Sequence, residues 1–500
     1  MTVESEAIVA VDIGTSSIRA TLISLSGELL ATRSTPTPTH RMRDGSAGLD
    51  AAECWGLTQS AIAGVSGGAR VLGIGVAAQL GLVLVDAALE AITPVMLWSD
   101  QTAQPYVAEV REAFRASAAP TVGRRISSEL AAPRLRMLLD RQPEVMDRAA
   151  KVLSLKDYLT AKLTGVATTD PTHASYTLLY DVAERAWSTD FVVSLGLAGS
   201  LLPEVRTASE VAGFLRSDVA RACGLPESIP VAVGGPDGTV GAIGAGASEY
   251  GRTVDIAGTT DVLVHVVEDP LIDPESVVTT NAHVADGLWT IGGATGMTGG
   301  TLSWLAGMFG YPDVESMNRE LEGSLEAVPT GSNGVLVDPA LTGHRFPYWD
   351  LARTGRIQGV TPGTGRADIV NATNEGAAFL VAVGLGEISR LGQDPTSVAV
   401  VGGVARREAN LRLRADVWGI PVEGVSDGMA TSRGVAVLAA TASGLFSSLG
   451  EASEHLVPRG TTFEPDGARA AVYRDILTTW KQTFSGLDTI RGSGHTLPLS

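Results

Sequence analysis

Two hydroxyl-rich turns, each between two apolar segments of strand type, are the residues best suited to phosphate chemistry. The first is Asp12-Ile13-Gly14-Thr15-Ser16-Ser17, followed by Arg19, and the second is Gly258-Thr259-Thr260. Successive N–H groups and hydroxyls at such a tip can donate to a phosphate chain. Asp12 suits Mg²⁺, directly or through water, and Arg19 can approach the phosphates. Two such turns facing each other would hold a nucleotide, whereas two ordinary surface hairpins are the alternative.

Pairs of glycines could let the backbone approach a flat ligand. Gly402 and Gly403 follow the apolar run Val398–Val401, and Gly299 and Gly300 precede a predicted helix. A glycine pair after a buried strand admits a planar group such as adenine. The alternative is tight packing between a helix and a strand.

Two carboxylates could act on a hydroxylated substrate. Asp237 follows an apolar strand and begins a predicted helix, whose dipole favours the ionised form. An ionised carboxylate in a cleft can accept the proton of a substrate hydroxyl. In the loop Trp98-Ser99-Asp100, an aromatic face and a carboxylate together suit a sugar. The alternatives are a helix N-cap for Asp237 and an ordinary turn for the loop.

The composition excludes several classes of protein. The chain has 500 residues, 44% of them hydrophobic, which excludes wholesale disorder, and a net charge of −18. Such an acidic chain is a poor candidate for binding nucleic acid or an anionic membrane. Its two cysteines cannot form a disulfide framework, which fits a reducing, cytoplasmic location. We expect no signal peptide and no membrane-spanning helix.

Other catalytic scaffolds fit poorly. No lysine follows a glycine, so the P-loop signature is absent. Gly73-Ile-Gly75-Val-Ala-Ala78 matches a dinucleotide-binding pattern, but a strand-like segment follows where a helix is required. Gly424-Val-Ser426 begins a nucleophile-elbow pattern, which makes a serine hydrolase a remote third hypothesis. The seven histidines show no metal-hydrolase spacing.

Strand and helix patterns alternate throughout, which predicts an α/β fold. The segments 9–17 and 253–261 both read as an apolar strand, a Gly-Thr-hydroxyl turn and a return strand. This weak internal repeat is spaced as two duplicated lobes would be. We expect lobes over residues 1–247 and 248–450, then a C-terminal helix and a loosely ordered tail over 451–500.

Taken together, these motifs resemble the FGGY carbohydrate kinases, which have the actin/hexokinase ATPase fold. The resemblance runs from about residue 7 to residue 450. It is carried by the order of VAVDIGTSS (9–17), LWSDQTA (97–103), LSLKDYLTAKLTG (153–165), GGPDG (234–238), DIAGTTDVL (255–263), the segment 355–379 and VVGGVARREANLRLRADVWGIPV (400–422). Each motif is weak alone, and their order and spacing make the assignment strong.

The resemblance implies two actin-like, ribonuclease H-like lobes around a central cleft, in which ATP and Mg²⁺ phosphorylate a sugar hydroxyl. It makes Asp237 the general base, and Asp12 and Asp237 the residues near the metal. The residues implied at the nucleotide are Gly14, Thr15, Ser16, Ser17, Arg19, Gly258, Thr259, Thr260, Gly299, Gly402 and Gly403. Those implied at the sugar are Gln79, Trp98, Asp100 and Asp237. It also suggests a homodimer.

Four departures from the family pattern bear on the substrate. Xylulokinase-like members often have Gln-Met-His-Gly where this chain has Gln79-Leu80-Gly81, so a histidine is missing. Pro236 replaces a common glycine. Asp261 stands where a small residue is usual, and we expect it to point to solvent rather than join a metal shell. Asn374 stands at an apolar position and could mark a changed helix contact.

The leading hypothesis is therefore an ATP-dependent kinase of a ketopentose such as xylulose. Gluconate, ribulose, a deoxyketose or a four-carbon polyol are open alternatives. A hypothesis of another class is a catalytically weak sugar or nucleotide sensor, motivated by Pro236, Asp261 and Asn374. Intact Asp12 and Asp237 argue against it.

Overall fold

The computed structural model describes residues 5–116, 122–425 and 428–485. The chain forms two compact units. The first contains Met1–Arg252, Val264–Ile291 and Met429–Arg459, and the second contains Thr253–Leu263, Gly292–Gly428 and Gly460–Ser500. These units do not coincide with the expected lobes, because residues 429–459 belong with the first unit; boundaries after 247 and 450 stay a prediction. The expected loose tail from residue 486 lies outside the described residues.

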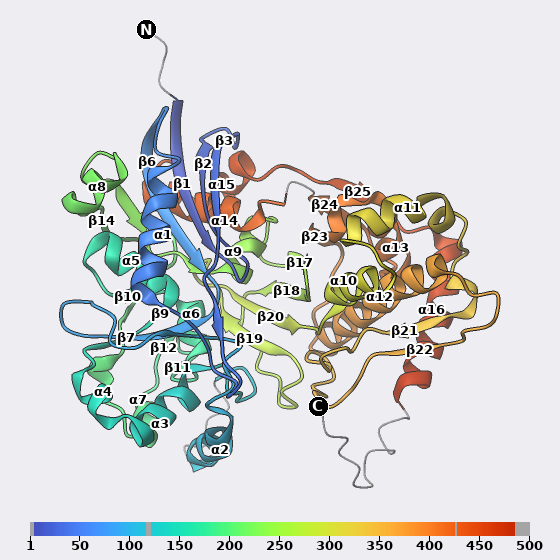
Figure 1. The fold of residues 1–500 in the computed structure, drawn as a ribbon, viewed down its shortest axis with the longest axis horizontal. Coiled ribbons are helices and arrows are strands. Elements are labelled where there is room, and N and C mark those ends of the chain that lie inside the picture. The colour runs from blue at the N-terminus through green and yellow to red at the C-terminus, as the bar shows by residue number, and fades with distance from the viewer. Residues whose placement is uncertain (1–4, 117–121, 426–427, 486–500) are drawn as a thin grey trace. The chain divides into compact units, whose positions relative to one another are not determined.

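A mixed sheet organises the first unit (Figure 1). Its order is β14-β15-β6-β1-β2-β3, and β16 also pairs with β6. β1 is antiparallel to β2 and parallel to β6. The central strand β1 is apolar and buried over Ala7–Val11, as expected of a strand covered on both faces. The strands are β1 (Ser5–Ile13), β2 (Ser17–Ser24), β3 (Leu29–Pro36), β6 (Ala69–Ala78), β14 (Val211–Phe214), β15 (Pro230–Ala232) and β16 (Gly235–Pro236).

Helices cover this sheet, and a smaller sheet is formed by segments that alternate with its strands along the chain. The smaller sheet has the order β4-β5-β8-β7-β9. Its strands are β4 (His40–Arg41), β5 (Ala47–Leu49), β7 (Gly81–Val85), β8 (Val95–Leu97) and β9 (Lys151–Ser154). The helices of the unit are α1 (Ala51–Ala63), α2 (Val107–Ala116), α3 (Ala131–Arg141), α4 (Pro143–Arg148), α5 (Leu155–Thr164), α6 (Pro171–Tyr176), α7 (Thr189–Ser194), α8 (Ser217–Cys223), α9 (Asp237–Ile243), α14 (Ala430–Ala442) and α15 (Leu449–Leu456).

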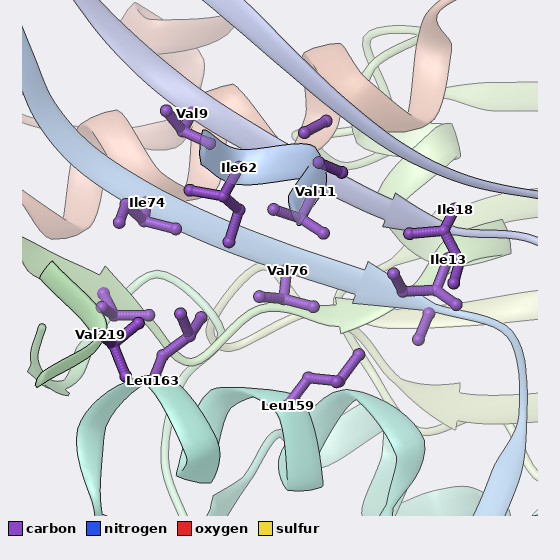
Figure 2. Close-up of a cluster of buried hydrophobic side chains, with 14 of the residues drawn as sticks. Val9, Val11, Ile13, Ile18, Ile62, Ile74, Val76, Leu159, Leu163 and Val219 are labelled. Carbon is purple, nitrogen blue, oxygen red and sulfur yellow. The ribbon is translucent and has the colours of Figure 1, made fainter. Parts of the chain in front are cut away.

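The core of the first unit holds the phosphate turn in place. Figure 2 shows Val9, Val11 and Ile13 of β1 in one cluster with Val76 of β6 and Leu159 of α5. All five side chains are buried. Full burial of an aliphatic side chain contributes roughly 1.5–3 kcal/mol, so the end of β1 is anchored where the turn begins.

The second face of the sheet is covered by α14, which comes from a distant part of the sequence (Figure 1). This helix contacts β1, β6 and α9. A methyl group on Gly75 of β6 would come within 2.8 Å of the Val435 side chain, so glycine allows the close approach. Gly73 and Gly75 therefore serve helix packing within a strand, and β7 follows β6, as expected from the sequence.

The second unit is also a sheet with helices. Its strands belong to a seven-stranded sheet of the order β19-β20-β18-β17-β23-β24-β25, in which β19 (Thr279–Ala282) falls among residues of the first unit, and β21 pairs with β22. The strands are β17 (Thr253–Ala257), β18 (Asp261–Val267), β20 (Trp289–Ala294), β21 (Leu336–Asp338), β22 (Arg356–Gln358), β23 (Val398–Gly402), β24 (Val422–Val425) and β25 (Thr461–Phe463). The helices are α10 (Thr298–Met308), α11 (Val314–Glu326), α12 (Arg366–Arg390), α13 (Glu408–Trp418) and α16 (Gly467–Ser485).

Helix α12 is long and apolar enough, by length and composition, to cross a membrane. However, 72% of its most apolar window is buried inside the protein. Phe379 and Leu380 of α12 pack with Trp480 of α16. This is the burial of a core helix.

Candidate active site

The predicted first phosphate turn is a hairpin tip. β1 and β2 pair as far as Ile13 and Ile18. The Gly14 N–H donates to the Ser17 carbonyl at 2.9 Å, and the Gly14 carbonyl accepts the Thr37 hydroxyl at 2.8 Å. Thr15 and Ser16 at the tip are exposed. These contacts fix the turn while its tip can reach a ligand.

Gln79, directly after the end of β6, supports this turn. Its backbone N–H donates to the Ile13 carbonyl at 2.8 Å, and its side-chain amide donates to the Gly14 carbonyl at 3.1 Å. Gln79 itself is buried. The next residue, Leu80, accepts the Trp98 N–H at 3.0 Å. Gln79 therefore links the phosphate turn to the loop of Trp98.

Asp12 and Asp237 lie close enough for their charges to interact. Burial and the nearby Asp237 charge together raise the pKa of Asp12 to about 7, although Arg19 at 3.9 Å opposes the rise. Burial also raises the pKa of Asp237, which begins α9 as expected and accepts the Gly238 N–H at 2.8 Å. Two carboxylates that disfavour each other's charge are the hard oxygen ligands that suit Mg²⁺. The residues present therefore fit this ion.

The Asp100 carboxylate holds its own loop. One oxygen accepts the Ala47 N–H at 2.9 Å, and the other accepts the N–H and the hydroxyl of Thr102. Asp100 is 4% exposed. Both oxygens are thus engaged in positioning the loop of Trp98, and a direct sugar contact of Asp100 stays a prediction.

A buried charged network, which the sequence motifs did not reveal as a site, lies near Asp237. The Lys156 ammonium is 3.1 Å from Asp170 and also contacts Asp157. Burial opposes the ammonium form, but both carboxylates outweigh it and raise the pKa of Lys156. Burial likewise opposes ionisation of Asp170, but Lys156 and His173 hold its pKa below the usual value. Asp157, Asp170 and His173 are spaced to hold a metal ion, but Lys156 supplies the cation among them.

The second hydroxyl turn joins β17 to β18. The Gly258 N–H donates to the Thr260 carbonyl at 3.0 Å, and the Thr259 carbonyl accepts the Gly300 N–H from the start of α10 at 3.0 Å. A methyl group on Gly299 would lie well inside van der Waals contact with the Gly258 carbonyl. The glycine at position 299 therefore lets α10 begin directly against the turn.

A cavity of about 670 Å³ opens beside this turn. It is lined by Gly258, Thr259, Gly299 and Gly403, as the sequence predicted for nucleotide contacts. Thr260 and Gly402 do not line the cavity. Gly402 nevertheless packs against Ala257, and Ala257 is one of the lining residues. Motif analysis missed the lining residues supplied by α11, by the turn after β23 and by α13, which are Val314, Glu315, Asn318, Arg319, Glu322, Val404, Arg406, Arg407 and Asn410.

The expectation that Asp261 points to solvent is wrong. Asp261 is 1% exposed, and its carboxylate lies 3.1 Å from the guanidinium of Arg414 in α13. Arg414 is also 3.4 Å from Asp255. Burial raises the pKa of both carboxyl groups, and Arg414 opposes the rise. Arg414 lies about 150 residues away in the sequence, so no local pattern could place Asp261 inside.

The other departures have local explanations. Pro236 lies in β16 and precedes α9 as its N-cap, a position that needs no backbone N–H. Asn374 is buried in α12, and its amide donates to the Val370 carbonyl one turn earlier. Ser426, on which the hydrolase hypothesis rests, lies outside the described residues.

Comparison with known proteins covers most of the chain. Residues 7–244 match the N-terminal domain, and residues 254–443 the C-terminal domain, of the "FGGY family of carbohydrate kinases". Xylulose kinase of Bacillus subtilis is 28% identical, over 96% of both chains. Autoinducer-2 kinase of Yersinia enterocolitica is 27% identical, over 100% of this chain and 98% of the other. The crystal structure of a xyloylose kinase from Brucella ovis matches with a TM-score of 0.87 and 27% identity, over 96% of this chain and 99% of the other. The predicted α/β fold with two actin-like, sheet-containing domains is thereby confirmed.

Proposed function

Because the chain belongs to the FGGY family of carbohydrate kinases, it is a sugar kinase that uses ATP, and we propose that it phosphorylates a ketopentose of the xylulose type. The observation that carries the chemistry is the proximity of Asp237, Asp12 and the phosphate turn at the end of β1. A base, a metal ligand and phosphate donors occur together in one unit.

In the proposed reaction, a carboxylate oxygen of Asp237 accepts the proton of the attacking sugar hydroxyl. The hydroxyl oxygen bonds to the γ-phosphorus of ATP, and ADP leaves. Thr15, Ser16 and Ser17 donate to the phosphates, with Arg19 nearby. Asp12 and Asp237 would hold Mg²⁺, and the ion would supply positive charge near the phosphate oxygens. Most of the catalysis is positioning and charge neutralisation, since phosphoryl transfer has a loose transition state.

The cavity of the second unit is the proposed binding site for the nucleotide. Gly258, Thr259 and Gly299 contact the phosphates through their backbone. Gly403 faces the adenine, with Gly402 supporting it. Thr260 is the least supported member of this set, because it does not line the cavity.

The choice of xylulose rests on the similarity to xylulose kinases along nearly the whole chain. The missing histidine after Gln79 keeps the alternatives open: gluconate, ribulose, a deoxyketose or a four-carbon polyol. The equally extensive similarity to autoinducer-2 kinases adds autoinducer-2 as a further candidate substrate. In the proposed sugar site, Trp98 packs against the substrate and Gln79 and Asp100 position the loops around it.

We also propose a cytoplasmic location, consistent with two free cysteines, Cys54 and Cys223, and a net charge of −18. Nucleic acid and membranes are poor partners for so acidic a chain. A homodimer stays a prediction. The sensor hypothesis is weakened because Asp261 is neutralised by Arg414 and Pro236 fits its N-cap position, so neither disturbs the site.

The test is ATP consumption with Mg²⁺ against ketoses, aldoses, polyols, sugar acids and autoinducer-2. We expect one substrate to exceed the water background well, and Asp237→Asn to abolish that turnover while ATP binding stays near normal. Asp181→Asn is the matched control, because the Asp181 carboxylate caps its own turn in the same unit. Full activity of Asp237→Asn would refute the role of Asp237. Tight sugar binding without turnover of any substrate would favour the sensor.

A further inference from the structure

His173 has one ring nitrogen that is held and one that is free. It lies in α6 and is 4% exposed. Its Nδ1 lies 2.7 Å from the Asp170 carboxylate. Its Nε2 is buried and has no hydrogen-bond partner among the described residues. An unpaired buried polar atom is costly, so such an atom in a functional region indicates a missing partner.

The free nitrogen is rigidly oriented. Asp170, which fixes the ring, also contacts the Lys156 ammonium and accepts the backbone N–H groups of Thr172 and His173. An ionised Asp170 at Nδ1 favours the tautomer with the proton on Nδ1. Nε2 then carries a lone pair, which accepts a hydrogen bond from a hydroxyl.

The surroundings of His173 include the two residues that follow Gln79. His173 lines a cavity of about 50 Å³ together with Leu80, Gly81, Arg134 and Tyr176. Leu80 and Gly81 directly follow Gln79, where the sequence lacks the histidine common in xylulokinase-like proteins. Burial raises the pKa of Asp237, and a positive charge on His173 opposes that rise, so the two residues lie within electrostatic range of each other.

Resting on the proposed function, we propose that Nε2 of His173 accepts a hydrogen bond from a second hydroxyl of the sugar, one that is not phosphorylated. The imidazole absent after Gln79 is thus supplied from α6. His173 is a specificity-determining residue for polyhydroxylated substrates. Its role is binding rather than proton transfer, which remains with Asp237.

The test uses His173→Asn, because an asparagine amide can retain the donor to Asp170 but has no atom at Nε2. We expect KM for the accepted sugar to rise about ten- to a hundredfold, the usual effect of one lost buried hydrogen bond, with kcat and KM for ATP nearly unchanged. Ser175→Ala is the control, since Ser175 lies in the same helix, is buried and hydrogen-bonded, and does not line the cavity.

Monodeoxy analogues of the accepted sugar identify the hydroxyl. For the analogue that lacks the hydroxyl bound by His173, wild type and His173→Asn should show the same KM, because neither can form that hydrogen bond. If the wild type phosphorylates a sugar and His173→Asn does so with an unchanged KM, this inference is overturned while the proposed function stands. If KM for the sugar and KM for ATP rose equally in His173→Asn and in Ser175→Ala, the role of His173 would be structural, and the inference would be overturned. A wild type that phosphorylates no substrate would overturn it together with the proposed function.

Discussion

Gly299→Ala should weaken nucleotide binding, because the added methyl group meets the Gly258 carbonyl at the start of α10. Backbone on both sides cannot give way by a rotamer change, so α10 must move away from the turn. Overpacking of this kind typically costs about 1–3 kcal/mol, and the severe contact places this substitution at the upper end, ~3 kcal/mol. The higher helix propensity of alanine stabilises the helix by about 1 kcal/mol relative to glycine. The expected net loss is ~2 kcal/mol.

Gly307→Ala is the matched control in the same helix. A methyl group on Gly307 would meet nothing within 4 Å, so only the gain in helix propensity remains, about 1 kcal/mol. Urea denaturation should therefore separate the two variants by ~3 kcal/mol. Calorimetric titration with ATP should show a loss of ~10-fold or more for Gly299→Ala and none for Gly307→Ala. Equal stability and wild-type ATP affinity in both variants would refute the reasoning.

Two titrations test the buried carboxylates. Since the pKa of Asp12 is about 7 in the metal-free protein, Mg²⁺ competes with a proton below that pH; its apparent affinity should fall by about tenfold per pH unit, and Asp12→Asn should flatten the profile. A pH-independent Mg²⁺ affinity in wild type would contradict this. Arg414→Met should lower the free energy of unfolding at pH 7 by ~3–5 kcal/mol, because Asp255 and Asp261 lose their cation. Both carboxyl groups have pKa values raised in the folded protein, so they hold extra protons there, and the variant should regain stability as pH falls toward the ordinary carboxyl range. Urea denaturation at pH 5 and pH 8 measures this, and an equal loss at both values would rule it out.

Local patterns were sufficient for the elements that carry the phosphate turns. The hairpin around Gly14 follows from an apolar strand, a glycine and hydroxyls, all within a few residues. The helix beginning at Asp237 follows equally from local signals. Such features need no knowledge of distant partners, so sequence analysis predicted them correctly.

Features that depend on distant partners were not predictable. Asp261 is buried because Arg414 neutralises it, and charge alone indicates a surface position. His173 is an isolated histidine in the sequence, and only its contact with Asp170 and its buried, unpaired Nε2 distinguish it. Asn410 lines the nucleotide cavity from a helix whose contact with the cavity no local motif indicates.

The placement of α14 has a consequence for how the protein is made. The first unit contains the first 252 residues but also Met429–Arg459, and α14 covers β1 and β6 (Figure 1). During translation, the central strands leave the ribosome long before the helix that shields their second face. Val435 and its neighbours reach Gly75 only after nearly the whole chain is synthesised. The nascent chain must therefore carry an uncovered apolar sheet face through most of translation, a stage at which chaperone binding or aggregation competes with folding.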